Sequence, residues 1–267
     1  MSLIVRRFQE SDREGFGNVR SLTYRGGDPV RPDENIIPND CLGYVAELDG
    51  TIVAGFTALK MTCNMWGTHL PCAGIAAVGV VPNARKSGVG GKLMSEGLRL
   101  LKEDGFAVAS LYPFREPFYR KSGYATCGGR LRISVPAHRF PPVRGELDVR
   151  HQSPIDLDAL NPCHATFSSR YNGSNVRSPE KWHRHLGGET PMAVFVAGDP
   201  VEAYAVLRLQ ADFWTVQEVK ELVWSSRRGY ESILGFLAGI GINKTELTWF
   251  EPSDSPFKAT YLDQGIT

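Results

Sequence analysis

Short apolar runs bounded by glycine, proline or charged residues predict strands along the whole first half of the chain. The expected strands and hairpins cover residues 3–8, 44–59, 61–81, 106–112 and 125–135. Apolar residues at helical spacing predict helices between them, over residues 11–25, 88–105 and 115–123. Strands and helices that alternate in this order are typical of an α/β or α+β domain with a mixed sheet.

The second half shows the same kinds of pattern. Helices are expected over residues 155–169, 178–186 and 229–241, and strands over residues 193–209 (a hairpin), 213–226 and 245–252. A run with three prolines and no periodicity separates the halves. We therefore expect a first domain over residues 1–136, a linker over 137–149 and a second domain over 150–267.

Two long segments follow one common order of strand, turn, helix, strand and proline. They cover residues 80–113 and 222–252. The turn of the second segment is shorter and keeps one glycine, Gly229. We interpret the pair as two copies of one architecture, of which only the first has a glycine-rich loop.

Composition narrows the class of protein. The chain has 267 residues, of which 42% are hydrophobic and 22% are charged, enough for two folded domains with cores of their own. Its formal net charge of +1 argues against nucleic-acid and anionic-membrane partners. Five irregularly spaced cysteines without a CxxC pair predict neither disulfides nor a metal site, and suggest the reducing cytoplasm. The sequence shows no signal peptide or membrane span.

Candidate chemistry is concentrated in residues 79–93, GVVPNARKSGVGGKL, where a strand turns into a helix. The first amide groups of a helix have no intrahelical partner, and together with the helix dipole they bind anions, phosphate above all. Gly88, Gly90 and Gly91 would allow a ligand to approach the backbone closely, and Arg85 and Lys86 add positive charge. The loop therefore predicts a phosphate or pyrophosphate site.

The spacing within the loop decides between phosphate motifs. Leu93 stands where a P-loop needs serine or threonine and where the Rossmann fingerprint needs its third glycine. Arg-x-x-Gly-x-Gly after a strand instead resembles the acyl-CoA pyrophosphate loop of the GNAT superfamily of N-acetyltransferases. The resemblance implies that acetyl-CoA binds there as co-substrate. The residues implied are Arg85, Lys86, Ser87, Gly88, Val89, Gly90 and Gly91, and, for the pantetheine arm between two splayed strands, Val78, Gly79 and Val80.

The segment EPFYRKSGY, residues 116–124, is similar to the short GNAT helix that carries the general acid. The resemblance implies that Tyr119 protonates the departing CoA thiolate. A phenol with a pKa of about 10 suits that task, although a tyrosine in such a helix is often a core residue. We interpret Tyr124 as a packing residue.

The tandem layout resembles the Eis (enhanced intracellular survival) family, whose members pair a CoA-binding GNAT domain with a second GNAT domain that lacks the phosphate loop. In that family a sterol-carrier-like third domain follows, and its terminal carboxylate acts as the base. The sequence stops about where the second domain should finish, so we do not expect the Thr267 carboxylate to be that base, and the base is unassigned. The family also implies a homo-oligomer.

The acceptor is an amine by the same resemblance. Residues 23–40 correspond to the acceptor-lining segment and carry the candidate substrate-binding residues Tyr24, Asp28, Asp33 and Glu34. Acids there favour a cationic small molecule or a lysine side chain, although each one is as readily explained as part of a solvated loop. His183 and His185 have no obvious metal-binding partners in sequence and are expected on a helix surface.

The expected function is therefore acetyl transfer from acetyl-CoA to a primary amine by direct attack on the thioester. The alternative is a non-catalytic CoA-binding or interaction module, because the strand before the loop lacks the glutamate that serves many GNAT enzymes as base. A hydrolase is a weaker possibility, since the sequence has no GxSxG nucleophile elbow.

Overall fold

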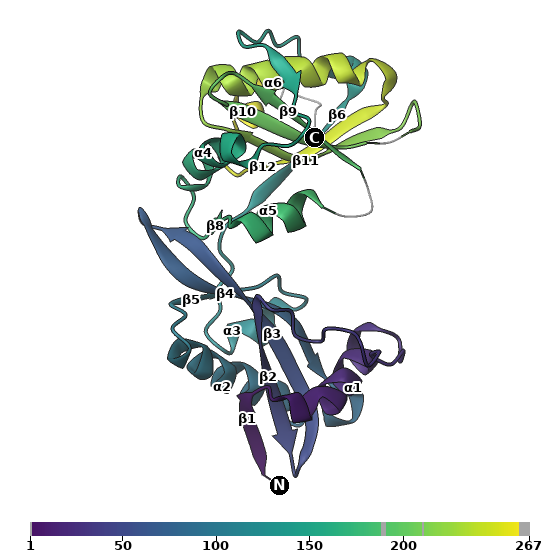
Figure 1. Ribbon diagram of the computed structural model, residues 1–267, viewed down its shortest axis with the longest axis vertical. Helices are drawn as coiled ribbons and strands as arrows, with labels where there is room; N and C mark the ends of the chain where they lie inside the picture. The colour runs from purple at the N-terminus through teal and green to yellow at the C-terminus, as the bar shows by residue number, and fades with distance from the viewer. Residues whose placement is uncertain (1, 188–190, 210, 262–267) are drawn as a thin grey trace. The chain divides into compact units, whose positions relative to one another are not determined.

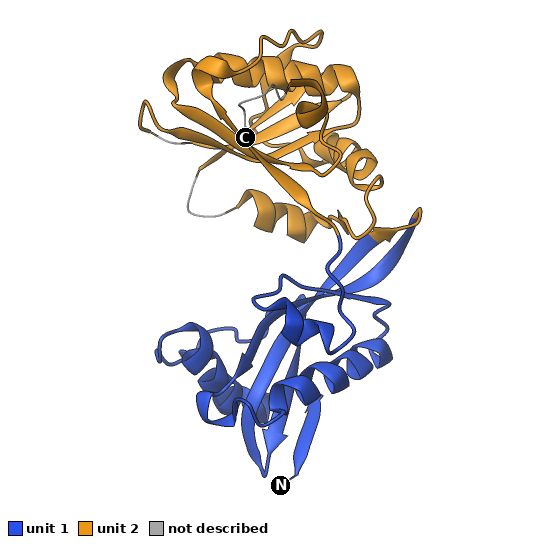
Figure 2. Cartoon of the chain, turned by 180° about the vertical axis from the view of Figure 1, so that it is seen from behind, with its two compact units in different colours: residues 1–63, 68–127 blue, residues 64–67, 128–267 orange. Residues whose placement is uncertain are grey.

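The computed structural model describes residues 2–187, 191–209 and 211–261. The chain divides into two compact units, residues 1–63 with 68–127 and residues 64–67 with 128–267, which Figure 2 colours separately. Each unit has its own mixed sheet and its own helices (Figure 1). The predicted mixed α/β fold class is confirmed.

The sheet of the first unit has the strand order β1-β2-β3-β4-β5. Its strands are β1 (Leu3–Arg7), β2 (Cys41–Leu48), β3 (Thr51–Met65), β4 (Thr68–Val80) and β5 (Val108–Ser110). Its helices are η1 (Glu10–Asp12), α1 (Arg13–Tyr24), η2 (Pro82–Ala84), α2 (Val89–Glu103) and α3 (Glu116–Arg120). β2 pairs antiparallel with β1 and β3, whereas β4 and β5 run parallel. A parallel pair needs a crossover, and α2 provides it.

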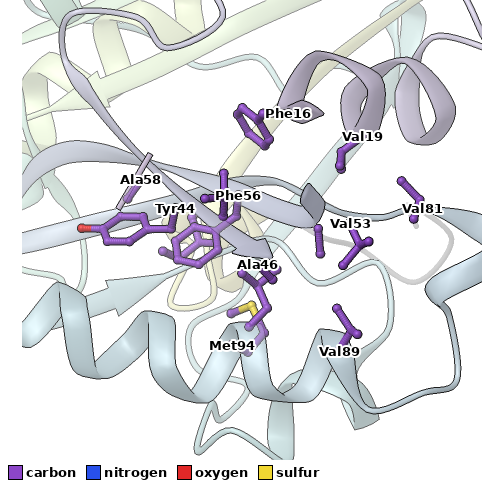
Figure 3. Packing of buried hydrophobic residues seen from close by; sticks show 14 of the residues in the cluster. Phe16, Val19, Tyr44, Ala46, Val53, Phe56, Ala58, Val81, Val89 and Met94 are labelled. Carbon is purple, nitrogen blue, oxygen red and sulfur yellow. The ribbon is translucent and has the colours of Figure 1, made fainter. Parts of the chain in front are cut away.

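The core of the first unit forms where α1 and α2 pack on the sheet. Figure 3 shows Phe16 and Val19 of α1 on one side of the strands and Met94 of α2 on the other. A β-carbon on Gly97 would lie 2.5 Å from the Phe56 ring, so this glycine lets α2 approach the sheet closely. The close packing fixes the start of α2 relative to the end of β4.

The second unit has the strand order β6-β12-β11-β10-β9-β7. The strands of this sheet are β6 (Arg130–Pro136), β7 (Val149–His151), β9 (Met192–Ala197), β10 (Ala203–Arg208), β11 (Val216–Trp224) and β12 (Glu246–Pro252), and the two-residue strand β8 (Asn175–Val176) lies outside it. Its helices are η3 (Ala137–Arg139), α4 (Leu157–Ser168), α5 (Pro179–Leu186), α6 (Arg227–Ile240), η4 (Gly241–Asn243) and α7 (Pro256–Tyr261). Strands β11 and β12 run parallel and α6 connects them, as α2 connects β4 and β5.

Two sequence expectations about the middle of the chain differ from the structure. The first domain is expected to extend to residue 136, but β6 pairs antiparallel with β12 in the second sheet. The expected linker is also part of the second unit, because Phe140, Val143 and Leu147 pack against its core. Apolar side chains among the prolines explain why this segment folds onto the unit instead of spanning a gap.

Candidate functional site

The glycine-rich loop connects β4 to α2 through the single turn η2. Gly88 is the N-cap of α2 and has a φ of 88°, in the left-handed region that favours glycine. Lys86 also has a positive φ, of 65°. As a glycine, Gly88 has no side chain that could cap the helix, and the first amide groups of α2 face the loop. The loop residues Arg85, Lys86, Ser87 and Gly88 are exposed, and this helix start is open to a ligand.

The side chains of the loop hold its shape as well as offering charge. The Arg85 Nε atom donates to the Val80 carbonyl at 3.1 Å, and the Ser87 hydroxyl donates to the Ala84 carbonyl at 2.7 Å. A β-carbon on Gly90 would lie 3.3 Å from the ring of Phe118, whereas one on Gly91 would meet nothing within 4 Å. Gly90 therefore allows α2 to pack against α3, a role that the sequence did not indicate.

Strands β4 and β5, which precede and follow α2 in the chain, pair with each other over only three residue pairs. Cys72, Ala73 and Gly74 of β4 pair with residues of β5, and β4 then continues past that partner to Val80. Ala77 has a φ of 53°, which is strained for alanine and interrupts the regular strand geometry there. This stretch of β4, residues 75–80, includes all three predicted pantetheine-binding residues, Val78, Gly79 and Val80.

Tyr24 connects α1 to this stretch of β4. Its hydroxyl donates to the carbonyl oxygen of Val78 at 2.6 Å. Burial raises the pKa of the Tyr24 phenol, although more than half of the residue's surface is exposed. The structure therefore brings a predicted substrate-binding residue into contact with a predicted cofactor-binding residue.

Tyr119 lies on α3 and is buried among aromatic rings. Its ring makes edge-to-face contacts with the rings of Phe114, Phe118 and Tyr124, at centroid distances of 5.5, 4.9 and 5.9 Å. Burial, with a smaller contribution from the nearby Tyr24, raises the pKa of Tyr119 to about 12. A pKa this high keeps the phenol in its protonated form throughout the physiological pH range.

Tyr124 is half-buried as a residue, but its hydroxyl group is fully buried. Burial raises the pKa of its phenol above the ordinary value, with smaller contributions from Tyr119 and Cys72. Its buried hydroxyl has no hydrogen-bond partner within the described part of the chain. Burying a hydroxyl group without a hydrogen-bond partner costs free energy, so the Tyr124 hydroxyl does not stabilise the fold.

The predicted acceptor residues do not form one acidic cluster. Asp28 and Asp33 are exposed, whereas Glu34 is half-buried and pairs with Arg25 at 2.7 Å. This ion pair holds the pKa of Glu34 below its usual value. Arg13 and Arg20 also hold this segment, since they donate to the carbonyls of Pro32 and Ile36 at 2.8 and 2.6 Å.

The second unit lacks an open helix start at the corresponding place. Ser226 caps α6, and the carboxylate of Glu202 accepts hydrogen bonds from the Ser226 hydroxyl at 2.6 Å and from Arg228 Nε at 2.9 Å. The main-chain oxygen of Glu202 would lie 2.8 Å from a β-carbon on Gly229. A side chain of the protein itself thus supplies the negative charge that this helix start favours.

Replacement of Glu202 by alanine should lower the free energy of unfolding by about 1.5 kcal/mol, because Ser226 and Arg228 lose a charged acceptor. Urea titration measures this loss. The partners lower the pKa of Glu202, so its contribution is present above its ordinary pKa and disappears as the pH falls through the lowered value. Glu231→Ala, which removes the ion pair with the exposed Arg227, is the control and should lower the stability by much less. Equal losses in the two variants would contradict this account.

The structure offers neither a metal cluster nor a membrane-spanning helix in its described ranges. His185 lies 3.2 Å from Glu221, yet across those ranges no three His, Cys, Asp or Glu side chains gather in a way that could hold a metal ion. None of the helices described there is both long and apolar enough to span a bilayer. Thr267, the terminal residue, lies outside the described residues.

Family models and solved structures agree with this geometry. Two models of the acetyltransferase (GNAT) domain match the chain, one over residues 5–127 and the other over residues 173–265. No curated protein matches the chain.

Among solved structures, a GCN5-related N-acetyltransferase from Anabaena variabilis is similar with a TM-score of 0.82 and 18% identity, over 98% of this chain and 69% of the other. Eis1 from Mycobacterium abscessus is similar with a TM-score of 0.75 and 18% identity, over 97% and 68%. A probable N-acyltransferase from Enterococcus faecalis is similar with a TM-score of 0.79 and 18% identity, over 94% and 65%. The chain spans about two thirds of the length of these proteins. The chain therefore contains two GNAT acetyltransferase domains in tandem, and its fold is similar to that of Eis1.

Proposed function

We propose that the first unit transfers an acetyl group from acetyl-CoA to a primary amine, with Tyr119 as the general acid. The observation that carries this proposal is an open, glycine-capped helix start beside a stretch of strand that extends past its neighbour and a buried, protonated tyrosine. These are the three elements that a thioester-dependent acyl transfer requires: an anion site, a strand edge for an extended arm and a proton donor.

The loop and β4 would bind the two ends of acetyl-CoA differently. The first amides of α2, in Val89, Gly90 and Gly91, are suited to the pyrophosphate, and exposed Arg85 and Lys86 add charge at the entrance. The main-chain groups of β4 beyond Gly74 are suited to the amides of the pantetheine arm.

Tyr119 would act when the carbon–sulfur bond breaks. The amine nitrogen forms a bond to the acetyl carbon, the sulfur leaves with the bonding electrons, and the phenolic proton passes to sulfur. The amine loses its extra proton to solvent, and the phenolate regains one from solvent. With a pKa of about 12, Tyr119 is a weaker acid than an exposed tyrosine, so the proton is expected to move as the sulfur departs rather than earlier.

The rate of turnover should rise with pH as the amine acceptor loses its proton and should not decline up to at least about pH 10. The reason is that burial disfavours the phenolate and raises the pKa of Tyr119 to about 12, so the acid form persists below that pH. Free thiol released at saturating acetyl-CoA, corrected for spontaneous thioester hydrolysis, measures the profile. A decline centred near pH 10, the ordinary pKa of a phenol, would show that Tyr119 ionises as an exposed tyrosine and would contradict this account.

A second candidate function is a CoA-binding module without catalysis. It is favoured by the sequence of β4, in which residues 68–80 contain no acidic side chain to accept the proton of the amine. Incubation with acetyl-CoA and a panel of amines separates the two candidates. Acetylated product supports the transferase, whereas tight acetyl-CoA binding without any product supports the module.

A further inference from the structure

Three exposed aromatic side chains lie at the end of α1 and on the segment between β5 and α3, the helix that carries Tyr119. Tyr24, Tyr112 and Phe114 are exposed to 56%, 92% and 73% of their possible surface. Large aromatic groups in water are unfavourable unless they serve binding, and a group of them marks an interaction site more often than single ones do. We call these three residues the aromatic wall.

Contacts with Tyr119 and β4 place two members of the aromatic wall, Phe114 and Tyr24, at the proposed reaction centre, and the chain places Tyr112 two residues from Phe114. The Phe114 ring lies 5.5 Å from the Tyr119 ring, nearly perpendicular to it. Tyr24 is bonded to the Val78 carbonyl and is close enough to influence the ionisation of Tyr119. Tyr112 is the second residue after the end of β5, two positions before Phe114. Members of the wall therefore come from α1 and from the segment that follows β5.

The acidic residues within residues 23–40 are the alternative surface that could select an acceptor, but their charges are partly paired or screened. Glu34 is neutralised by Arg25, and the guanidinium groups of Arg13 and Arg20 hold the backbone of the same segment. Asp28 and Asp33 are exposed, where water and salt screen their charges. An aromatic surface next to a loop in which an ion pair and screening reduce the effect of the acids favours a flat, apolar acceptor over a highly charged one.

We propose that the aromatic wall selects the acceptor, and that the acceptor is an arylalkylamine, a primary amine on a short chain attached to an aromatic ring. This inference rests on the proposed function. The ring of such a molecule can stack on Phe114 and Tyr112, which removes apolar surface of both partners from water. Its short chain extends the nitrogen beyond the stacked ring, and while the nitrogen is protonated the ring faces also attract its charge.

The test compares phenethylamine, butylamine and spermidine as acceptors for the full chain at saturating acetyl-CoA. We expect kcat/KM to be at least about tenfold higher for phenethylamine than for spermidine, since a tenfold ratio corresponds to about 1.4 kcal/mol of stacking. Tyr112→Ser and Phe114→Leu should each raise the KM for phenethylamine about fivefold and change that for butylamine less than twofold. Phe213→Leu, an equally exposed phenylalanine of the second unit, is the control and should change neither.

Three results would overturn the inference, and they have different meanings. A preference for spermidine that is lost in Asp28→Asn/Asp33→Asn would assign selection to the acidic loop. A loss of acetyl-CoA affinity in Phe114→Leu, measured by calorimetry, would assign the wall to the co-substrate. Acetyl-CoA binding without acetylation of any amine would reject the proposed transferase itself, and with it the acceptor.

Discussion

Replacement of Tyr119 by phenylalanine is expected to lower kcat about 100-fold, the usual contribution of a positioned general acid. The variant keeps the ring and its edge-to-face contacts with Phe114, Phe118 and Tyr124, so the fold around α3 should be preserved. Affinity for acetyl-CoA should change less than twofold, because only the proton donor is lost. Steady-state thiol release together with calorimetry measures the two quantities separately.

Tyr124→Phe is the matched control for this experiment. The variant removes the same hydroxyl group from the neighbouring ring, where it is buried without a hydrogen-bond partner among the described residues. It should leave kcat unchanged and should not lower the melting temperature. Full activity in Tyr119→Phe, or an equal loss in both variants, would show that the Tyr119 hydroxyl is not the acid.

Replacement of Gly88 by valine should weaken acetyl-CoA binding about 30-fold, which corresponds to about 2 kcal/mol. Gly88 begins α2 with a φ of 88°, and a β-branched residue avoids this conformation. The loop would change its backbone to relieve the strain, and the amide groups of the first turn would no longer converge. Calorimetric titration with acetyl-CoA gives the affinity.

Gly105→Val separates the loss of a ligand site from simple backbone strain. Gly105 follows the other end of α2 and has the same φ of 88°, and a β-carbon added there would meet nothing within 4 Å, as at Gly88. This variant should lower thermal stability to a similar extent while its affinity for acetyl-CoA remains at the wild-type value. Equal loss of affinity in both variants would mean that the loop does not bind the co-substrate directly.

Local features of the fold were predicted from the sequence more successfully than pairings between distant segments. The hairpin expected within residues 44–59 and the helix expected over residues 88–105 depend on neighbouring residues, and both occur. The strand β6 was expected in the first sheet, because an apolar strand pattern shows that a strand forms but not which strand it pairs with. The strand expected over residues 106–112 is shorter in the structure for the same reason, because the length of β5 depends on how far it stays paired with β4.

In the candidate site, too, the sequence predicted a local feature but not the contacts between distant residues. The open helix start follows from glycines at fixed spacing, a pattern that is visible in the sequence. A count of acids could not show that Arg25 neutralises Glu34, and no sequence pattern indicated the positive φ of Ala77 or the Glu202 carboxylate at the start of α6. Each of these features depends on contacts made only in the folded chain.

The stretch of β4 that extends past β5 has a practical consequence for handling the protein. Peptide groups along an uncovered strand edge recruit other strands, which is a common start of aggregation. Residues 75–80 continue past the end of β5 without a partner strand on that side, although Tyr24 and Arg85 donate hydrogen bonds to the carbonyls of Val78 and Val80. Concentrated stocks without coenzyme should therefore become turbid on storage sooner than stocks supplemented with it, because a bound arm would shield this edge in the way a neighbouring strand does.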